Sequence, residues 1–166
     1  MVAQLKLGIR IGSQELAKFS YLAKLGASVV LPAYSGRFVV CGTSTGYHIA
    51  IATSAAAISG YIEESLTSSS TAGVTQLPLC TNIDMVEFEL PYATGGAAAT
   101  LTDAVLNTTS GGLVGKTCDA YVDTNGIQYA NVSSNSQGVF LITGGSVANN
   151  TIFVRVPNAK IGQAAL

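Results

Sequence analysis

The chain has 166 residues, enough for one ordinary domain with a proper hydrophobic core. Only 10% of the residues are charged, whereas about 25% is typical of soluble proteins. Ser, Thr, Asn and 18 Gly take the place of the missing charge. Such a neutral surface suits contact with other protein molecules, because charged groups there would have to be desolvated. The composition therefore predicts that part of the surface is buried in an oligomer or a larger assembly.

The few charges are unevenly placed along the chain. The first 25 residues hold four basic side chains, Lys6, Arg10, Lys18 and Lys24, and a single acidic one. Between Arg37 and Lys116 no residue is basic and six are acidic. The pattern fits either a basic arm that docks on an acidic partner or simple scatter among few charges. Four separated basic residues are too few for a nucleic-acid surface, so no nucleic-acid partner is predicted.

Residues 4–11 alternate between apolar and polar, which predicts a strand with one buried face. Ser13 is a suitable N-cap for a following helix over 13–26, in which an apolar stripe ends at Gly26. The predicted strand has no hairpin partner beside it in the sequence. We therefore interpret 1–26 as an arm and 27–166 as a β body. The arm is expected to add a strand to the sheet of a neighbouring protein, with pairing to its own body as the alternative. The interface residues predicted on this strand are Leu5, Lys6, Leu7, Ile9, Arg10 and Ile11.

The next segment reads as short strands separated by turns, at 27–31, 36–42, 47–53 and 56–62, followed by a polar loop at 65–73. No residue from Phe38 to Ile62 is charged, but a polar, glycine-containing cluster interrupts this stretch. Each half is too short to span a membrane as a helix. We expect instead that this region lies near a homo-oligomer contact, with Phe38, Val40, Ile49 and Ile51 as the candidate residues.

Further along, residues 83–90 predict an amphipathic strand that Pro91 ends, followed by a flexible loop over 94–100. The sequence Thr124-Asn125-Gly126 predicts a hairpin between strands 118–123 and 127–132, since Asn and Gly tolerate positive φ. A second hairpin is predicted between strands 138–143 and 151–156. About ten short strands at this spacing predict an all-β sandwich or barrel.

Cys41, Cys80 and Cys118 are too widely spaced for a disulfide framework or a zinc motif, and the sequence shows no signal peptide. Buried free thiols in a protein made in a reducing cytoplasm are the simplest interpretation. A zinc site joining these cysteines to His48, the only histidine, has suitable atoms but no ligand spacing. His48 is better explained as a hydrogen-bonded structural residue.

Two further patterns resemble sites of known chemistry. The segment from Ser110 to Thr117 resembles a phosphate-binding loop but has Ser110 where the motif needs glycine, and a predicted strand where it needs a helix. Glu87 and Glu89 are spaced like the carboxylates of some glycosidases, but the solvent-facing side of an amphipathic strand explains them more simply. No enzyme activity, cofactor or metal is predicted.

The C-terminal third carries a family resemblance. Its segments are Val-Gly-Lys-Thr-Cys-Asp at 114–119, Gly-Ile-Gln at 126–128, Gly-Val-Phe-Leu-Ile-Thr-Gly-Gly at 138–145 and Asn-Asn-Thr-Ile-Phe-Val-Arg-Val at 149–156. These segments resemble the small head-decoration, or capsid cement, proteins of tailed bacteriophages. The resemblance implies a β-barrel or β-tulip body, usually trimeric, bound to the major capsid protein on the virion exterior. It transfers no functional residue, since the family has no fixed site motif.

The alternative function is a phage tail or fibre β-domain that binds a host glycan. Exposed aromatic rings are frequent in sugar sites, and this chain has no Trp and seven scattered Tyr. The sequence therefore favours a structural virion protein.

Overall fold

The computed structural model describes residues 8–11, 20–31, 37–42, 45–51, 55–107 and 111–162. The protein is all-β, as the sequence predicts. The strands are β1 (Gly8–Ile11), β2 (Ser20–Lys24), β3 (Val30–Leu31), β4 (Arg37–Cys41), β5 (His48–Ala50), β6 (Gly60–Ile62), β7 (Leu66–Thr67), β8 (Gln76–Cys80), β9 (Glu87–Thr94), β10 (Ala97–Ala98), β11 (Thr117–Val122), β12 (Gln128–Asn131), β13 (Phe140–Ser146) and β14 (Thr151–Arg155). Two 3-10 turns, η1 (Ile83–Met85) and η2 (Asn158–Lys160), and one short helix, α2 (Asp103–Asn107), complete the described elements.

The C-terminal half forms a sheet that closes on itself, here called the barrel. Its strands pair in the order β9-β12-β11-β13-β14, and β14 pairs again with β9. The pairs are antiparallel except β12 with β9, which is parallel. The long strand β9 makes this closure possible, because its first half pairs with β14 and its second half with β12. Both hairpins predicted in this region, β11–β12 and β13–β14, are confirmed.

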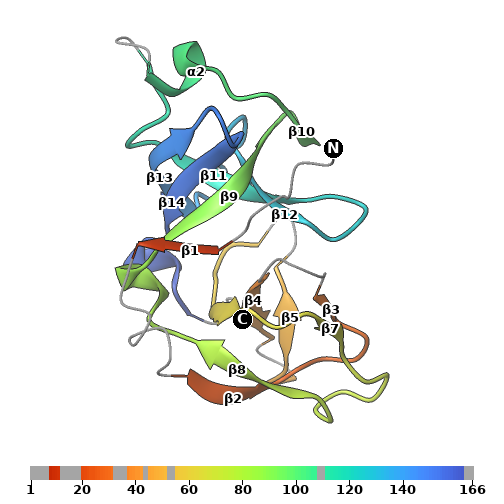
Figure 1. The fold of residues 1–166 in the computed structure, drawn as a ribbon. Helices are drawn as coiled ribbons and strands as arrows, with labels where there is room; N and C mark the ends of the chain where they lie inside the picture. Colours follow the sequence, from red (N-terminus) through yellow and green to blue (C-terminus); the bar gives the residue numbers. More distant parts are fainter. Residues whose placement is uncertain are drawn as a thin grey trace.

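The N-terminal half forms the second sheet, an antiparallel one with the order β2-β8-β6-β4-β5. It curls so that Leu25, directly after β2, bridges His48 at the start of β5. Strands β3 and β7 form a small pair beside it. Figure 1 shows the barrel above and the second sheet below, so that β2 and β8 lie at one end of the molecule and α2 at the other.

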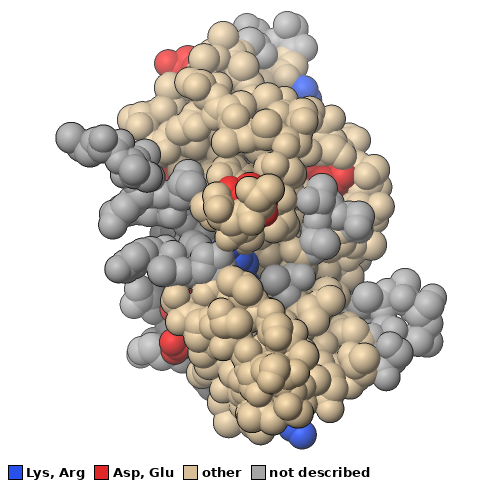
Figure 2. Space-filling view, turned by 90° about the vertical axis from the view of Figure 1, so that its right-hand side faces the viewer, with Lys and Arg blue, Asp and Glu red and all other residues tan. Residues whose placement is uncertain are grey.

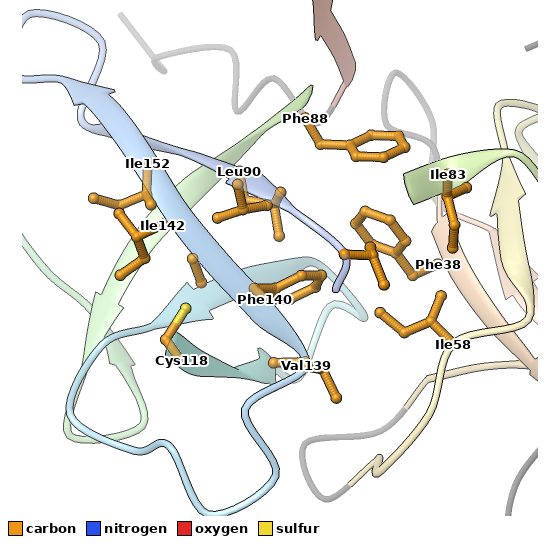
Figure 3. Packing of buried hydrophobic residues seen from close by; sticks show 14 of the residues in the cluster. Phe38, Ile58, Ile83, Phe88, Leu90, Cys118, Val139, Phe140, Ile142 and Ile152 are labelled. Atoms are coloured by element: carbon orange, nitrogen blue, oxygen red, sulfur yellow. The ribbon is translucent and has the colours of Figure 1, made fainter. Parts of the chain in front are cut away.

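Both faces of the inner strands β4 and β6 of the second sheet are buried, and the alternation of side chains decides which core each residue enters. In β4, Phe38 belongs to the main core and Val39 to a smaller one, and in β6, Tyr61 and Ile62 divide in the same way. The main core fills the barrel and continues onto the second sheet. Phe38 reaches across, with its ring centroid 4.8 Å from that of Phe88 and 5.1 Å from that of Phe140. Figure 3 shows Phe38 between these barrel strands and Ile58 and Ile83.

The N-terminal segment differs from its prediction. Residues 20–24 form β2 rather than part of a helix, because β8 pairs with them along their whole length. Burial follows the strand period there, with Ala23 and Leu25 enclosed and Leu22 exposed. A helix of about 12 residues is only marginally stable unless it packs well. Pairing with β8 therefore overrides the weak helix propensity of this segment. Residues 4–7 and 12–19 lie outside the described residues, and the division at residue 26 stays a prediction.

The strand over 8–11 does have a partner in its own chain, contrary to the favoured expectation. Its backbone pairs antiparallel with β9, Gly8 opposite Glu89 and Ile9 opposite Phe88. No neighbouring segment of the sequence offered a strand to pair with. The first part of β9, on the edge that pairs with β12 further along, provides the partner. The alternative, pairing with its own body, is therefore the arrangement in the isolated chain.

Two predictions around β9 are also wrong. Pro91 does not end the strand, which continues to Thr94. The N–H of Tyr92 donates to the Asn150 carbonyl on the β14 side, so the N–H that Pro91 lacks would face the other edge. There Pro91 falls between the stretch paired with β1 and the stretch paired with β12, and no ladder hydrogen bond is lost. The predicted flexible loop is a tight hairpin to β10, turning at Gly95 and Gly96, which both have positive φ.

Gly60 is required where β6 crosses β8. A Cβ at this position would lie 2.5 Å from the Cys80 carbonyl oxygen and 2.7 Å from Leu79 Cδ1. We expect Gly60→Ala to lower the free energy of unfolding by about 1–3 kcal/mol, the usual effect of overpacking. Denaturant unfolding measures this change. Gly111→Ala is the matched control, because its Cβ would meet nothing closer than Lys116 Nζ at 3.7 Å, and an equal loss there would contradict the steric explanation.

Candidate functional site

The side chains most suited to catalysis are the histidine and the three cysteines. All of them are buried. His48 is 4% exposed, and burial lowers its pKa, opposed by a hydrogen bond to the backbone of Lys24. Cys41, Cys80 and Cys118 are buried free thiols, as predicted. Burial raises the pKa of Cys118 to about 12, which keeps it protonated and a poor nucleophile at neutral pH.

No three or more His, Cys, Asp or Glu side chains among the described residues are grouped so that they could hold a metal ion. The phosphate-loop segment leads directly into β11 at Thr117, so Lys116 is followed by a strand and not by a helix. The dipole and free N–H groups of a helix N-terminus are therefore missing where a phosphate would need them.

Glu87 and Glu89 lie on the outer face of β9 while Phe88 and Leu90 point into the core. Glu87 is buried rather than solvent-facing, which corrects the prediction, because β1 and β14 flank it. Each carboxylate accepts a short hydrogen bond from a threonine: Thr143 Oγ1 lies 2.7 Å from Glu87 Oε2, and Thr151 Oγ1 lies 2.6 Å from Glu89 Oε1. Both carboxylates thus act in holding β13 and β14 against β9.

Gln128, at the start of β12, makes polar contacts between the barrel and the second sheet. Its side chain is fully buried. The Phe38 N–H donates to Gln128 Oε1 at 2.9 Å, and Gln128 Nε2 donates to the Phe38 carbonyl at 3.0 Å and to the Ile51 carbonyl at 3.3 Å. The amide therefore satisfies the Phe38 N–H, which lies just beyond Val39, the last residue of β4 that pairs with β5. We call this contact, together with Arg37 and Asp123, the seam.

Arg37 and Asp123 carry the charges of the seam. The side chain of Arg37 on β4 is fully buried, and burial lowers its pKa to about 10, while the negative charge of Asp123 acts in the opposite direction. Arg37 therefore remains charged at neutral pH. Asp123 belongs to the β11–β12 turn and also accepts a hydrogen bond from Tyr129 Oη at 3.3 Å. Sequence reasoning missed both residues, because their partners lie far away in the sequence.

Asp119, on β11, fixes the loop that joins β12 to β13. Its carboxylate accepts hydrogen bonds from Ser134 Oγ at 2.6 Å, Ser136 Oγ at 2.9 Å, Gln137 N at 2.9 Å and Gly138 N at 2.7 Å. Burial alone would raise the pKa of Asp119, but these four donors outweigh it and lower the pKa below the ordinary value. The carboxylate is thus a structural anion with all its acceptor positions engaged.

The outer surface is poor in charge and carries isolated apolar side chains at both ends of the molecule. At the end formed by the second sheet, the exposed residues are Leu22, Val30, Ile49 and Val74; at the end near α2 they are Val105, Val114 and Val147. The exposed charged residues described over positions 20–80 are Lys24, Glu63 and Glu64. Figure 2 shows charged groups widely separated by uncharged surface on the face that it presents. A surface with so few charges suits contact with protein, because few charged groups would have to be desolvated there.

The predicted contact residues are placed as follows. Phe38 and Ile51 fill the chain's own core, at 0% and 1% exposed, so they cannot present side chains to another subunit. Val40 packs against the main core, and Ile49 is 47% exposed. The sequence pattern of β4 and β5 indicated apolar strands. It did not show which face of these strands the barrel covers, because that depends on the tertiary fold. Leu5, Lys6 and Leu7 lie outside the described residues; for Ile9, Arg10 and Ile11 the backbone alone is described.

No family model, curated protein or solved structure matches this chain. In the part of the chain that the structure describes, no helix is both long and apolar enough to cross a membrane.

Proposed function

We propose that the protein is a non-enzymatic structural component of a virion, a capsid decoration protein that binds the major capsid protein and stabilises the shell. The observation that carries this proposal is a barrel-like β body whose surface has few exposed charges and several exposed large apolar side chains. A cement protein needs a rigid body and contacts that remain favourable without charge, because many weak, repeated contacts then add up over the shell. The resemblance of the C-terminal segments to phage head-decoration proteins supports the same assignment.

The proposal includes assembly as a homotrimer on the capsid exterior, after synthesis in the host cytoplasm. Among the residues whose side chains the structure describes, Ile49 is a predicted contact residue with an exposed side chain, and Leu22 and Val74 are the most exposed large apolar residues, at 62% and 63%. The end formed by the second sheet is therefore the surface that we propose to contact other subunits and the shell. Exposed apolar groups of this size each stabilise a contact by about 1.5–3 kcal/mol when fully buried.

The test is co-sedimentation of the purified protein with shells assembled from the major capsid protein of the same genome. Wild-type protein should pellet with the shells, and Leu22→Asp and Ile49→Asp should each weaken binding by about tenfold or more, as expected from losing one buried apolar side chain. Ala104→Asp is the control, since Ala104 is exposed on α2, at the opposite end of the molecule from β2 and β8 (Figure 1). Absence of wild-type binding would overturn the proposal, as would equal loss in all three variants.

A glycan-binding tail or fibre domain remains the alternative, and the same protein distinguishes it. Binding to a host-glycan array in the absence of any binding to shells would replace the capsid proposal. Native mass spectrometry of the free protein tests the trimer directly.

A further inference from the structure

The β11–β12 turn contains the chain's single Asn-Gly dipeptide, Asn125-Gly126. Asn125 is exposed in the turn. Asn-Gly is the dipeptide in which spontaneous deamidation is easiest, because glycine has no side chain to hinder attack by its own backbone nitrogen. The rate of this reaction in the folded protein depends on the structure of the turn.

Deamidation proceeds in two steps. The backbone nitrogen of Gly126 attacks Cγ of Asn125, a new N–C bond forms, the C–N bond of the side-chain amide breaks, and ammonia leaves. Solvent water then opens the cyclic imide to aspartate or isoaspartate, so the net change is amide plus water to carboxylate plus ammonium. The first step needs a Gly126 N–H that can lose its proton and a backbone free to rotate toward the side chain.

Asp123 restrains both requirements. The Gly126 N–H donates to the Asp123 carbonyl at 3.0 Å. The Asp123 carboxylate oxygen Oδ1 accepts the N–H groups of Asn125 at 2.9 Å and of Ile127 at 2.8 Å. The Asp123 N–H in turn donates to the Ile127 carbonyl at 3.0 Å. One residue therefore holds the attacking nitrogen and the backbone on both sides of it.

We propose that Asn125 is a modification site, a deamidation position that the folded turn protects through Asp123. The consequence of losing protection extends beyond the turn. Isoaspartate adds a methylene to the backbone at residue 125, three residues before Gln128, which begins β12 and holds the Phe38 backbone. Deamidation to isoaspartate thus shifts the register of the residue that joins the barrel to the second sheet.

The test is peptide mapping by mass spectrometry after incubation at pH 8.5 and 37 °C, following the gain of about one dalton at Asn125. The native protein should deamidate at least tenfold more slowly than the same protein unfolded in concentrated urea. Asp123→Ala removes the two carboxylate hydrogen bonds to Asn125 and Ile127 and keeps the backbone bond to Gly126. The folded variant should therefore react about three- to tenfold faster than wild type, because the loss of these two bonds frees the backbone on both sides of the attacking nitrogen. Asp123→Asn keeps an acceptor oxygen and should stay near wild type.

Controls separate this reaction from general ageing. Asn125→Gln removes the site and should abolish the mass change in the turn peptide, while Asn135, exposed in the loop after β12, serves as an internal reference in every sample. Equal rates in native and urea-unfolded wild type would overturn the protection. A folded Asp123→Ala that reacts no faster would remove Asp123 from the explanation, and if that variant fails to fold, the native-against-unfolded comparison of wild type decides alone.

Discussion

Asp119→Ala is expected to lower the free energy of unfolding by about 3–4 kcal/mol, the largest single effect that we predict for a polar residue. The change removes a carboxylate that accepts four hydrogen bonds and leaves the backbone N–H of Gly138 buried without its partner. Chemical denaturation followed by circular dichroism measures the loss.

Asp119→Asn is the matched variant. Its amide oxygen can accept the two backbone N–H groups while its NH2 donates to the Ser134 and Ser136 hydroxyls, which can rotate to accept. We expect it to retain most of the stability at low pH. A loss as large as that of the alanine variant would show that the charge, and not the hydrogen-bond pattern, is what holds the loop.

The same pair of proteins predicts a pH dependence. The pKa of Asp119 is lower in the folded protein than its ordinary value, so its ionised form is favoured by folding. The stability that wild type has over Asp119→Asn should therefore be fully present above the ordinary carboxyl pKa of about 4 and be lost as the pH falls below it. A difference that grows on acidification would have the wrong sign.

Gln128→Leu is expected to cost about 2–3 kcal/mol, because the Phe38 N–H then stays buried without an acceptor. The Phe38 carbonyl is less affected, since it also accepts the Ile51 N–H at 3.0 Å. Leucine is close to glutamine in size, so the loss reports the hydrogen bonds rather than a cavity. Because Gln128 lies in the seam, Phe38 should also become less protected from amide hydrogen exchange.

Gln128→Glu separates hydrogen bonding from charge at this position. Protonated glutamate keeps an acceptor for Phe38, but the ionised form has no donor for the Phe38 and Ile51 carbonyl oxygens and lies in a fully buried position, so burial would raise its folded-state pKa. The variant should therefore approach wild type below the unfolded carboxyl pKa of about 4.3 and lose stability as the pH rises above it. A wild-type-like melting curve for Gln128→Leu at neutral pH would contradict the role assigned to the seam.

The all-β fold class and the two hairpins of the last third could be predicted from the sequence alone. Alternation and the turn signals at Asn125-Gly126 and Gly144 to Asn150 predicted the two hairpins, because those pairings join neighbouring segments. It also predicted the buried face of β9 at Phe88 and Leu90, since strand period alone places these residues on one side. The burial of the three cysteines followed from composition.

Strand pairing, burial and hydrogen bonds between residues distant in the sequence could not be predicted, because they depend on the tertiary fold. Whether 20–24 is helix or strand depended on β8, and the place of 8–11 depended on the free edge of β9. The same cause explains why Phe38 and Ile51, predicted at an oligomer contact, lie in the core: alternation marks an apolar face, but not which layer covers it. Gln128, Arg37 and Asp119 carry no local signal, because a lone polar residue in a strand becomes structural through the backbone groups and charges that the fold brings to it.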